Sequence, residues 1–252
     1  MRRYFAPHRH SALLIAIIAA FSVRPVISEA GVGNAVFGIA LVFLLLVALY
    51  NINVDDLVGE RGRLLAQSKR RRMLGWVLAA AAGSERIAVM FVHSRRLILW
   101  SSICWFLFVV YVTLSELRSV LKQRDVSGET ICMAVSVYLL MGFAWGFLYA
   151  IIFQLDPNSF NGLVALKPGV PIDFHPIFAV LGYFSLTTLS TVGFGDITPV
   201  TLQARYAAVA EGITGQFYLA ILVARLVGMQ MSRSIDQAVM SRDDSDDARK
   251  SG

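Results

Sequence analysis

Apolar runs long enough to cross a bilayer constrain this chain more than any other feature. Val36 to Ile52, Leu97 to Leu117 and Thr130 to Phe153 are apolar stretches, and a further one covers Ala204 to Ser232. About 20 such residues in a helix match the hydrocarbon thickness of a membrane. Hydrophobic residues make up 56% of the sequence and charged residues only 16%, which is too apolar for an ordinary soluble domain. The sequence therefore predicts an all-α polytopic membrane protein.

Two less regular segments complete an expected set of six transmembrane helices. Ala12 to Ile27 is apolar but short, and a cleaved signal peptide is the alternative because basic residues precede it. Met73 to Val92 is interrupted by Glu85 and Arg86, and charges at that depth are costly unless they face protein or water. A short or broken helix that brings both charges to an interface is the alternative for this segment.

The basic residues predict the orientation. Most of the 23 lysines and arginines lie near the two termini and in the loops Asp55 to Arg72 and Arg118 to Gly128. The positive-inside rule places these loops and both termini in the cytoplasm, with the protein in the cell (inner or plasma) membrane. The net charge of +6 sits in short runs beside apolar segments, which indicates membrane topology and lipid contact rather than a nucleic-acid partner. The two cysteines and four histidines show no disulfide or metal-site spacing.

A polar, glycine-containing string separates the last two long apolar runs. Residues 187–196 read TTLSTVGFGD. Gly193 and Gly195 can adopt left-handed dihedrals at little cost, so a backbone that alternates in handedness can point successive carbonyls the same way. A phosphate-binding loop is the alternative for this glycine pair, but Thr198 stands where its further glycine would be. Backbone oxygens arranged in this way can replace the hydration shell of a K+ ion.

The string resembles the pore signature of the tetrameric potassium channels, TTxTVGYGD, with Phe194 in the usual tyrosine place. The resemblance covers roughly Thr130 to Ser232 and is densest from Tyr183 to Arg205. It implies an outer helix, a re-entrant pore helix with a selectivity filter, and an inner helix, the filter lying between the fifth and sixth spans. Pro176 suits the first turn of the pore helix, which is expected to run to about Leu189.

The resemblance also implies roles for single residues. The K+ sites would be formed by filter carbonyls and one threonine hydroxyl, from Thr191, Val192, Gly193, Phe194 and Gly195. Asp196 would stand at the outer mouth. Filter support is expected from Tyr183, Phe184, Thr187, Thr188 and Glu211, where Glu211 is buried by depth and needs a partner such as the Thr188 hydroxyl. Gly215 matches the inner-helix hinge, with close helix packing as the alternative.

Two departures from the family pattern bear on selectivity. Phe194 lacks the hydroxyl that would bond to an aromatic cuff at Tyr183 and Phe184. Thr187 stands where some members place a glutamate that pairs with the outer aspartate. Further along, Arg225 is expected either to extend toward the membrane boundary or to make a contact near the gate.

The chain is expected to divide into residues 1–128, a four-helix membrane region; 129–232, the pore domain; and 233–252, a disordered cytoplasmic tail. One filter segment per chain supplies one quarter of a pore, so a homotetramer is expected. The predicted function is passive K+ conduction, with no catalysis, no cofactor beyond the permeant K+ and no small-molecule substrate. A weakly selective cation channel, an energised potassium transporter and a non-conducting scaffold with a vestigial pore are the alternatives. The fourth expected span, Leu97 to Leu117, lacks the regularly spaced arginines of a voltage sensor, so a strong voltage sensor is not expected.

Overall fold

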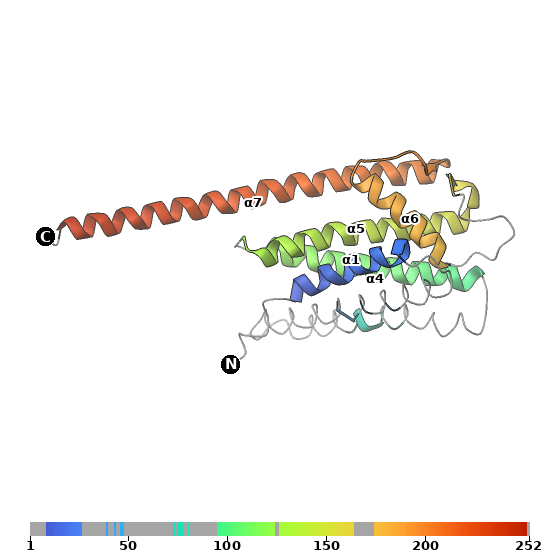
Figure 1. Cartoon of the computed structure of the whole chain (residues 1–252), viewed down its shortest axis with the longest axis horizontal. Helices are drawn as coiled ribbons and strands as arrows, with labels where there is room; N and C mark the ends of the chain where they lie inside the picture. The colour runs from blue at the N-terminus through green and yellow to red at the C-terminus, as the bar shows by residue number, and fades with distance from the viewer. Residues whose placement is uncertain are drawn as a thin grey trace.

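The computed structural model describes residues 9–26, 95–123, 126–163 and 174–250, together with residues 39, 43, 46, 47, 73, 75–77 and 80. These parts are almost entirely helical, as Figure 1 shows. The helices are α1 (Arg9–Val26), α4 (Arg95–Lys122), α5 (Gly128–Leu155), α6 (Phe174–Leu189) and α7 (Leu202–Lys250).

Within the described residues, three helices are long and apolar enough to cross a membrane. They cover residues 96–122 of α4, 128–155 of α5 and 202–231 of α7. These helices agree with an all-α membrane protein and correspond to the three apolar runs expected in this half of the chain. The apolar parts of α1 and α6 are shorter, Ser11–Ala20 and Ile177–Leu189. Glu85 and Arg86 lie outside the described residues, as do most residues of the expected second and third spans, so the count of six spans stays a prediction.

Local sequence signals explain where α5 and α6 begin and end. Ser127 caps α5, because its side-chain oxygen accepts a hydrogen bond from the Thr130 backbone N–H at 3.3 Å. The helix ends before Pro157, which begins a short 3-10 turn, Pro157–Ser159. Helix α6 contains Pro176 in its first turn and ends at Leu189, as the sequence predicts.

The end of α7 differs from the sequence-based expectation. A disordered tail is expected from residue 233, whereas α7 continues as a helix to Lys250. No glycine or proline interrupts residues 229–250, so nothing in the backbone ends the helix that the apolar part begins. In Figure 1 this part of α7 extends well past the ends of the other labelled helices.

Helix α5 is the centre of the described packing and contacts α1, α4, α6 and α7. Aromatic rings fill much of the core between these helices. The ring of Phe147 stacks on Trp105 of α4, with centroids 6.0 Å apart, and lies 4.2 Å from the ring of Phe178 on α6. Leu13 and Ile17 of α1 belong to the same buried cluster. The short α6 is thus held by a core that reaches back to the start of the chain.

A small two-stranded ribbon closes one end of the bundle. Strand β1 (Phe160–Asn161) pairs antiparallel with β2 (Thr198–Pro199), with Phe160 opposite Pro199. The Val200 N–H also donates to the Ser159 carbonyl at 2.8 Å. The chain that follows α5 is therefore fastened to the chain that leads into α7.

Candidate functional site

The TVGFGD segment begins at the last turn of α6. The N–H groups of Thr191, Val192 and Gly193 donate to carbonyls of that turn. The acceptors are Thr188 for Thr191, at 3.0 Å, and Thr187 for the other two, at 2.9 and 3.1 Å. These bonds satisfy carbonyls that a helix end leaves without an intrahelical partner. Thr187 and Thr188 thus position the segment through their backbone oxygens.

The backbone of the segment alternates in handedness, as the glycine pair predicts. Thr191, Gly193 and Gly195 have positive φ angles of 60, 50 and 79 degrees, whereas Val192 and Phe194 between them do not. The left-handed conformation costs a residue with a side chain about 1–2 kcal/mol, and Thr191 tolerates it within the capping bonds of α6. An added Cβ on Gly193 or Gly195 would meet no atom of this chain within 4 Å. The requirement for glycine at these positions therefore comes from the backbone conformation and not from crowding within the chain.

Tyr183 contacts the segment from the side of α6. Its ring is stacked with that of Phe194, with centroids 6.4 Å apart and planes 2 degrees from parallel. The Tyr183 hydroxyl also lies close enough to the carboxylate of Asp196 to interact with it electrostatically. Phe194 thus contacts Tyr183 by ring stacking, although phenylalanine has no hydroxyl that could form a hydrogen bond with a neighbouring residue.

Phe184 has a different environment from that of its neighbour Tyr183. It is buried, and its ring makes edge contacts with Tyr149 of α5 and Phe160 of β1, with centroids 5.0 and 5.5 Å away. The two expected cuff residues thus separate: Tyr183 contacts the TVGFGD segment, and Phe184 packs against α5 and the strand ribbon.

Glu211 lies at the junction of three helices and has no exposed surface. The Tyr149 hydroxyl of α5 donates to one of its carboxyl oxygens at 2.5 Å, and the Ser185 hydroxyl of α6 lies 2.5 Å from the other. The sequence predicts a pore-helix hydroxyl such as that of Thr188 as a partner, and the hydroxyl on α6 that makes this contact is that of Ser185, one helical turn before Thr188. Neither Tyr149 nor Ser185 was singled out from the sequence, although a hydroxyl in an apolar helix generally needs a partner.

Gly215, one turn further along α7, is buried against the end of α6. An added Cβ would lie 2.6 Å from the Leu189 carbonyl oxygen. That oxygen also accepts a hydrogen bond from the Tyr138 hydroxyl of α5 at 3.1 Å. Close packing of α7 against α6 therefore accounts for a glycine at this position, and the hinge role stays a prediction.

Arg225 makes a specific contact with the end of α4. Its guanidinium donates to the carbonyls of Val120, Leu121 and Gln123 at 2.5, 2.8 and 2.6 Å. These carbonyls lie at the negative end of the α4 dipole, where a cation is favourable. Arg225 therefore makes a specific contact within the protein and does not simply extend toward the membrane boundary.

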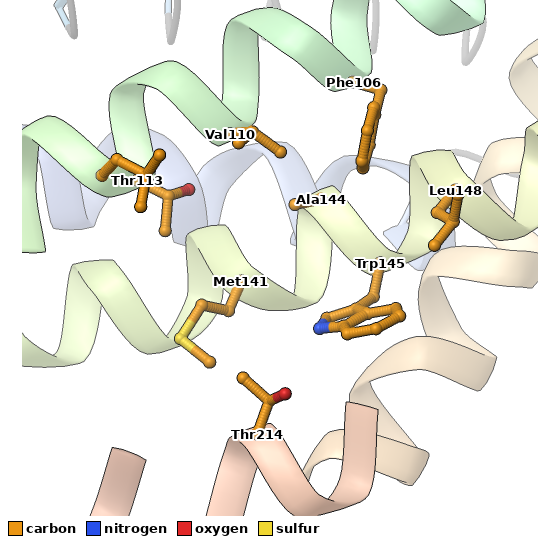
Figure 2. A pocket seen from close by; sticks show the side chains of 9 residues that line it. Phe106, Val110, Thr113, Met141, Ala144, Trp145, Leu148 and Thr214 are labelled. Atoms are coloured by element: carbon orange, nitrogen blue, oxygen red, sulfur yellow. The ribbon is translucent and has the colours of Figure 1, made fainter. Parts of the chain in front are cut away.

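A cavity of about 220 Å³ lies between α4, α5 and α7. Figure 2 shows Phe106 and Val110 of α4, Trp145 of α5 and Thr214 of α7 around it. Its lining residues carry no ionisable group, and they include none of the TVGFGD segment. Among the described residues, no group of three or more histidines, cysteines and acidic residues could hold a metal ion.

Comparison with known protein families identifies this same region. Residues 177–231, from α6 through the apolar part of α7, match the family model described as Ion channel. No curated protein and no solved structure matches the chain. The match covers the TVGFGD segment, most of α6 and the apolar part of α7. This region of the helical membrane protein is therefore similar to an ion channel domain, and that similarity supports passive ion conduction as the activity.

Proposed function

We propose that the protein is a potassium-selective channel that conducts K+ passively through a homotetrameric pore. The observation that carries the proposal is the alternation of backbone handedness at Thr191, Gly193 and Gly195, directly after α6. It occurs within the segment that matches the ion channel family. Successive carbonyls in such a backbone can face a common axis, and rings of carbonyls are what K+ selectivity filters use in place of water.

The proposed ion sites use the carbonyls of residues 191–195 and the hydroxyl of Thr191. Asp196 contributes negative charge at the outer mouth, and its carboxylate interacts electrostatically with the Tyr183 hydroxyl. Binding by these oxygens needs no cofactor and no small-molecule substrate. The proposed activity is transport down the electrochemical gradient without catalysis.

Apolar side chains that are exposed in the single chain support assembly into a tetramer. Val192 and Phe194 are 55% and 69% exposed, because one chain covers only one side of the segment. One face of α7 also exposes large apolar side chains at a spacing of three or four residues, Tyr206, Val209, Ile213, Phe217 and Ile221. Four copies around one axis would cover part of this surface and surround the ion.

The proposed topology follows the sequence. Six spans, with α6 as a re-entrant pore helix, would place the filter mouth outside and both termini in the cytoplasm, with the protein in the inner or plasma membrane of the cell. The remaining apolar surface would contact lipid. Residues 1–128 would form the four-helix membrane region beside the pore domain.

The decisive experiment is a reversal-potential measurement on the full-length protein in liposomes with opposed K+ and Na+ gradients. We expect a potential near the K+ equilibrium value, and native mass spectrometry in detergent should give a tetramer. A weakly selective cation channel is the second candidate, since Phe194 has no hydroxyl with which to stiffen the filter. That candidate predicts a potential near zero, and a protein that passes neither ion would contradict both.

A further inference from the structure

The hydroxyl of Ser185 lies between two oxygens that normally accept hydrogen bonds. It is 2.7 Å from the carbonyl oxygen of Gly142 and 2.5 Å from a carboxyl oxygen of Glu211. A serine hydroxyl carries one proton and can accept through two lone pairs, whereas a carbonyl oxygen can only accept. If Ser185 donates to Gly142, the proton in its contact with Glu211 has to come from Glu211.

The contact made by the second carboxyl oxygen of Glu211 is consistent with a protonated Glu211. The Tyr149 hydroxyl lies 2.5 Å from the second carboxyl oxygen of Glu211 and can donate its own proton there. The donors and acceptors then form one directed chain, from Tyr149 to Glu211, from Glu211 to Ser185, and from Ser185 to Gly142. It begins and ends on α5 and passes through α7 and α6, and each contact has one proton.

An ionised Glu211 would fit the same surroundings poorly. Ser185 would have a single proton for two acceptors, and a full negative charge would stand at a position with no exposed surface. In the described part of the chain its bonding partners are the two hydroxyls, with no cation among them. A buried carboxyl group without a cationic partner generally takes up a proton.

We propose that Glu211 is held as a neutral carboxylic acid that donates to Ser185 and thereby positions α6 beneath the filter. Ser185 precedes Thr191 by less than two helical turns, so its position affects where the TVGFGD segment begins. The positioning role depends on the proposed channel function, whereas the protonation state does not. As a neutral acid Glu211 adds no negative charge behind the filter, so it is a positioning residue and not an ion site.

Glu211→Gln tests the proposal because glutamine reproduces the neutral acid. Its amide N–H can donate to Ser185 while its carbonyl accepts from Tyr149. We expect Glu211→Gln tetramers to melt at the parent temperature and to keep the parent K+/Na+ reversal potential. Glu211→Ala removes both contacts, and we expect a lower melting temperature and a several-fold loss of K+ preference. A Glu211→Gln protein that fails to assemble, or that conducts differently from the parent, would overturn the proposal.

Infrared difference spectroscopy on the full-length protein gives a readout independent of conduction. The parent spectrum minus that of Glu211→Gln should contain the carbonyl stretch of a hydrogen-bonded carboxylic acid at neutral pH. Glu129→Gln is the matched control, because Glu129 is a part-buried carboxyl group at the start of α5, away from this junction. Its spectrum should keep the band. Carboxylate bands in place of the acid band would overturn the proposal. A parent protein that shows the acid band but passes no K+ would contradict the channel function alone.

Discussion

The carbonyl oxygen of Leu189 lies directly against Gly215, so that a Cβ added to this glycine would stand 2.6 Å from it. The same Cβ would meet the Cδ1 atom of Leu189 at 2.9 Å. A side chain can rotate away from such a contact, but a backbone carbonyl at the end of a helix cannot. The absence of a side chain at residue 215 therefore sets how closely α7 approaches the last turn of α6.

Gly215→Ala should consequently lower the stability of the assembled protein. Overpacking of this kind typically costs about 1–3 kcal/mol, and here it pushes on the turn from which the filter segment emerges. We expect a lower melting temperature in detergent together with reduced K+ flux into liposomes. Gly212→Ala is the matched control, because its Cβ would lie 4.0 Å from the Thr188 carbonyl and needs no rearrangement. Unchanged stability of Gly215→Ala with an altered open probability would support the hinge interpretation instead.

Gly195→Ala should abolish K+ flux while the tetramer survives. The φ angle of 79 degrees at Gly195 resists any side chain by roughly 1–2 kcal/mol per copy, and four copies would meet around one axis. The residue faces open space in the single chain, so assembly through α7 should be little affected. Flux assays and native mass spectrometry on the same preparation separate the two effects. If this variant conducts K+ as well as the parent, residues 191–195 are not the filter.

Phe194→Tyr should preserve conduction and give an equal or sharper preference for K+ over Na+. The aromatic ring can keep its stacking on Tyr183 while the new hydroxyl restores a group that can bond to the cuff. Phe184→Tyr is a useful comparison, since it adds the same hydroxyl to a buried aromatic cluster and should lower stability. Reversal potentials measured for the three proteins side by side decide the matter, and a non-conducting Phe194→Tyr would count against the proposed geometry.

Arg225→Gln should weaken the attachment of α7 to the end of α4. Three hydrogen bonds from a charged group are lost, and hydrogen bonds to charged groups contribute about 1.5–3 kcal/mol each. Arg225→Lys keeps the charge but not the planar fork, so an intermediate melting temperature is expected. Arg205→Gln is the control, because the exposed side chain of Arg205 makes a single hydrogen bond within the described residues, to the Pro199 carbonyl at 3.3 Å. Equal melting temperatures for Arg225→Gln and Arg205→Gln would contradict this prediction and favour the alternative in which Arg225 only extends toward the membrane boundary.

The same contact predicts an effect on opening. The apolar part of α7 would line the pore in the proposed channel, and Arg225 connects it to a helix that precedes the pore domain. We therefore expect the open probability of single channels in planar bilayers to change in Arg225→Gln, with an unchanged reversal potential. A shift of the reversal potential would instead indicate damage to the filter.

The parts of the protein that the sequence predicted are those governed by local rules. Apolar runs of membrane length predicted α4, α5 and the apolar part of α7, because hydrophobic length decides whether a helix can cross a bilayer. Pro176 predicted the first turn of α6, and the expected end of this helix at about Leu189 is also observed. The pair Gly193 and Gly195 predicted the alternating backbone, since only glycine adopts left-handed dihedrals without penalty.

What only the tertiary structure decided is which groups from different helices meet. The depth of Glu211 in an apolar helix indicates that it needs a partner, but the choice of Ser185 and Tyr149 depends on how α5, α6 and α7 pack. The same holds for Gly215 against Leu189 and for Arg225 at the end of α4. Such contacts join residues far apart in the chain through rigid helices. A change of one residue in the register of a helix rotates its side chains by about 100 degrees, so spacing along the sequence cannot specify them.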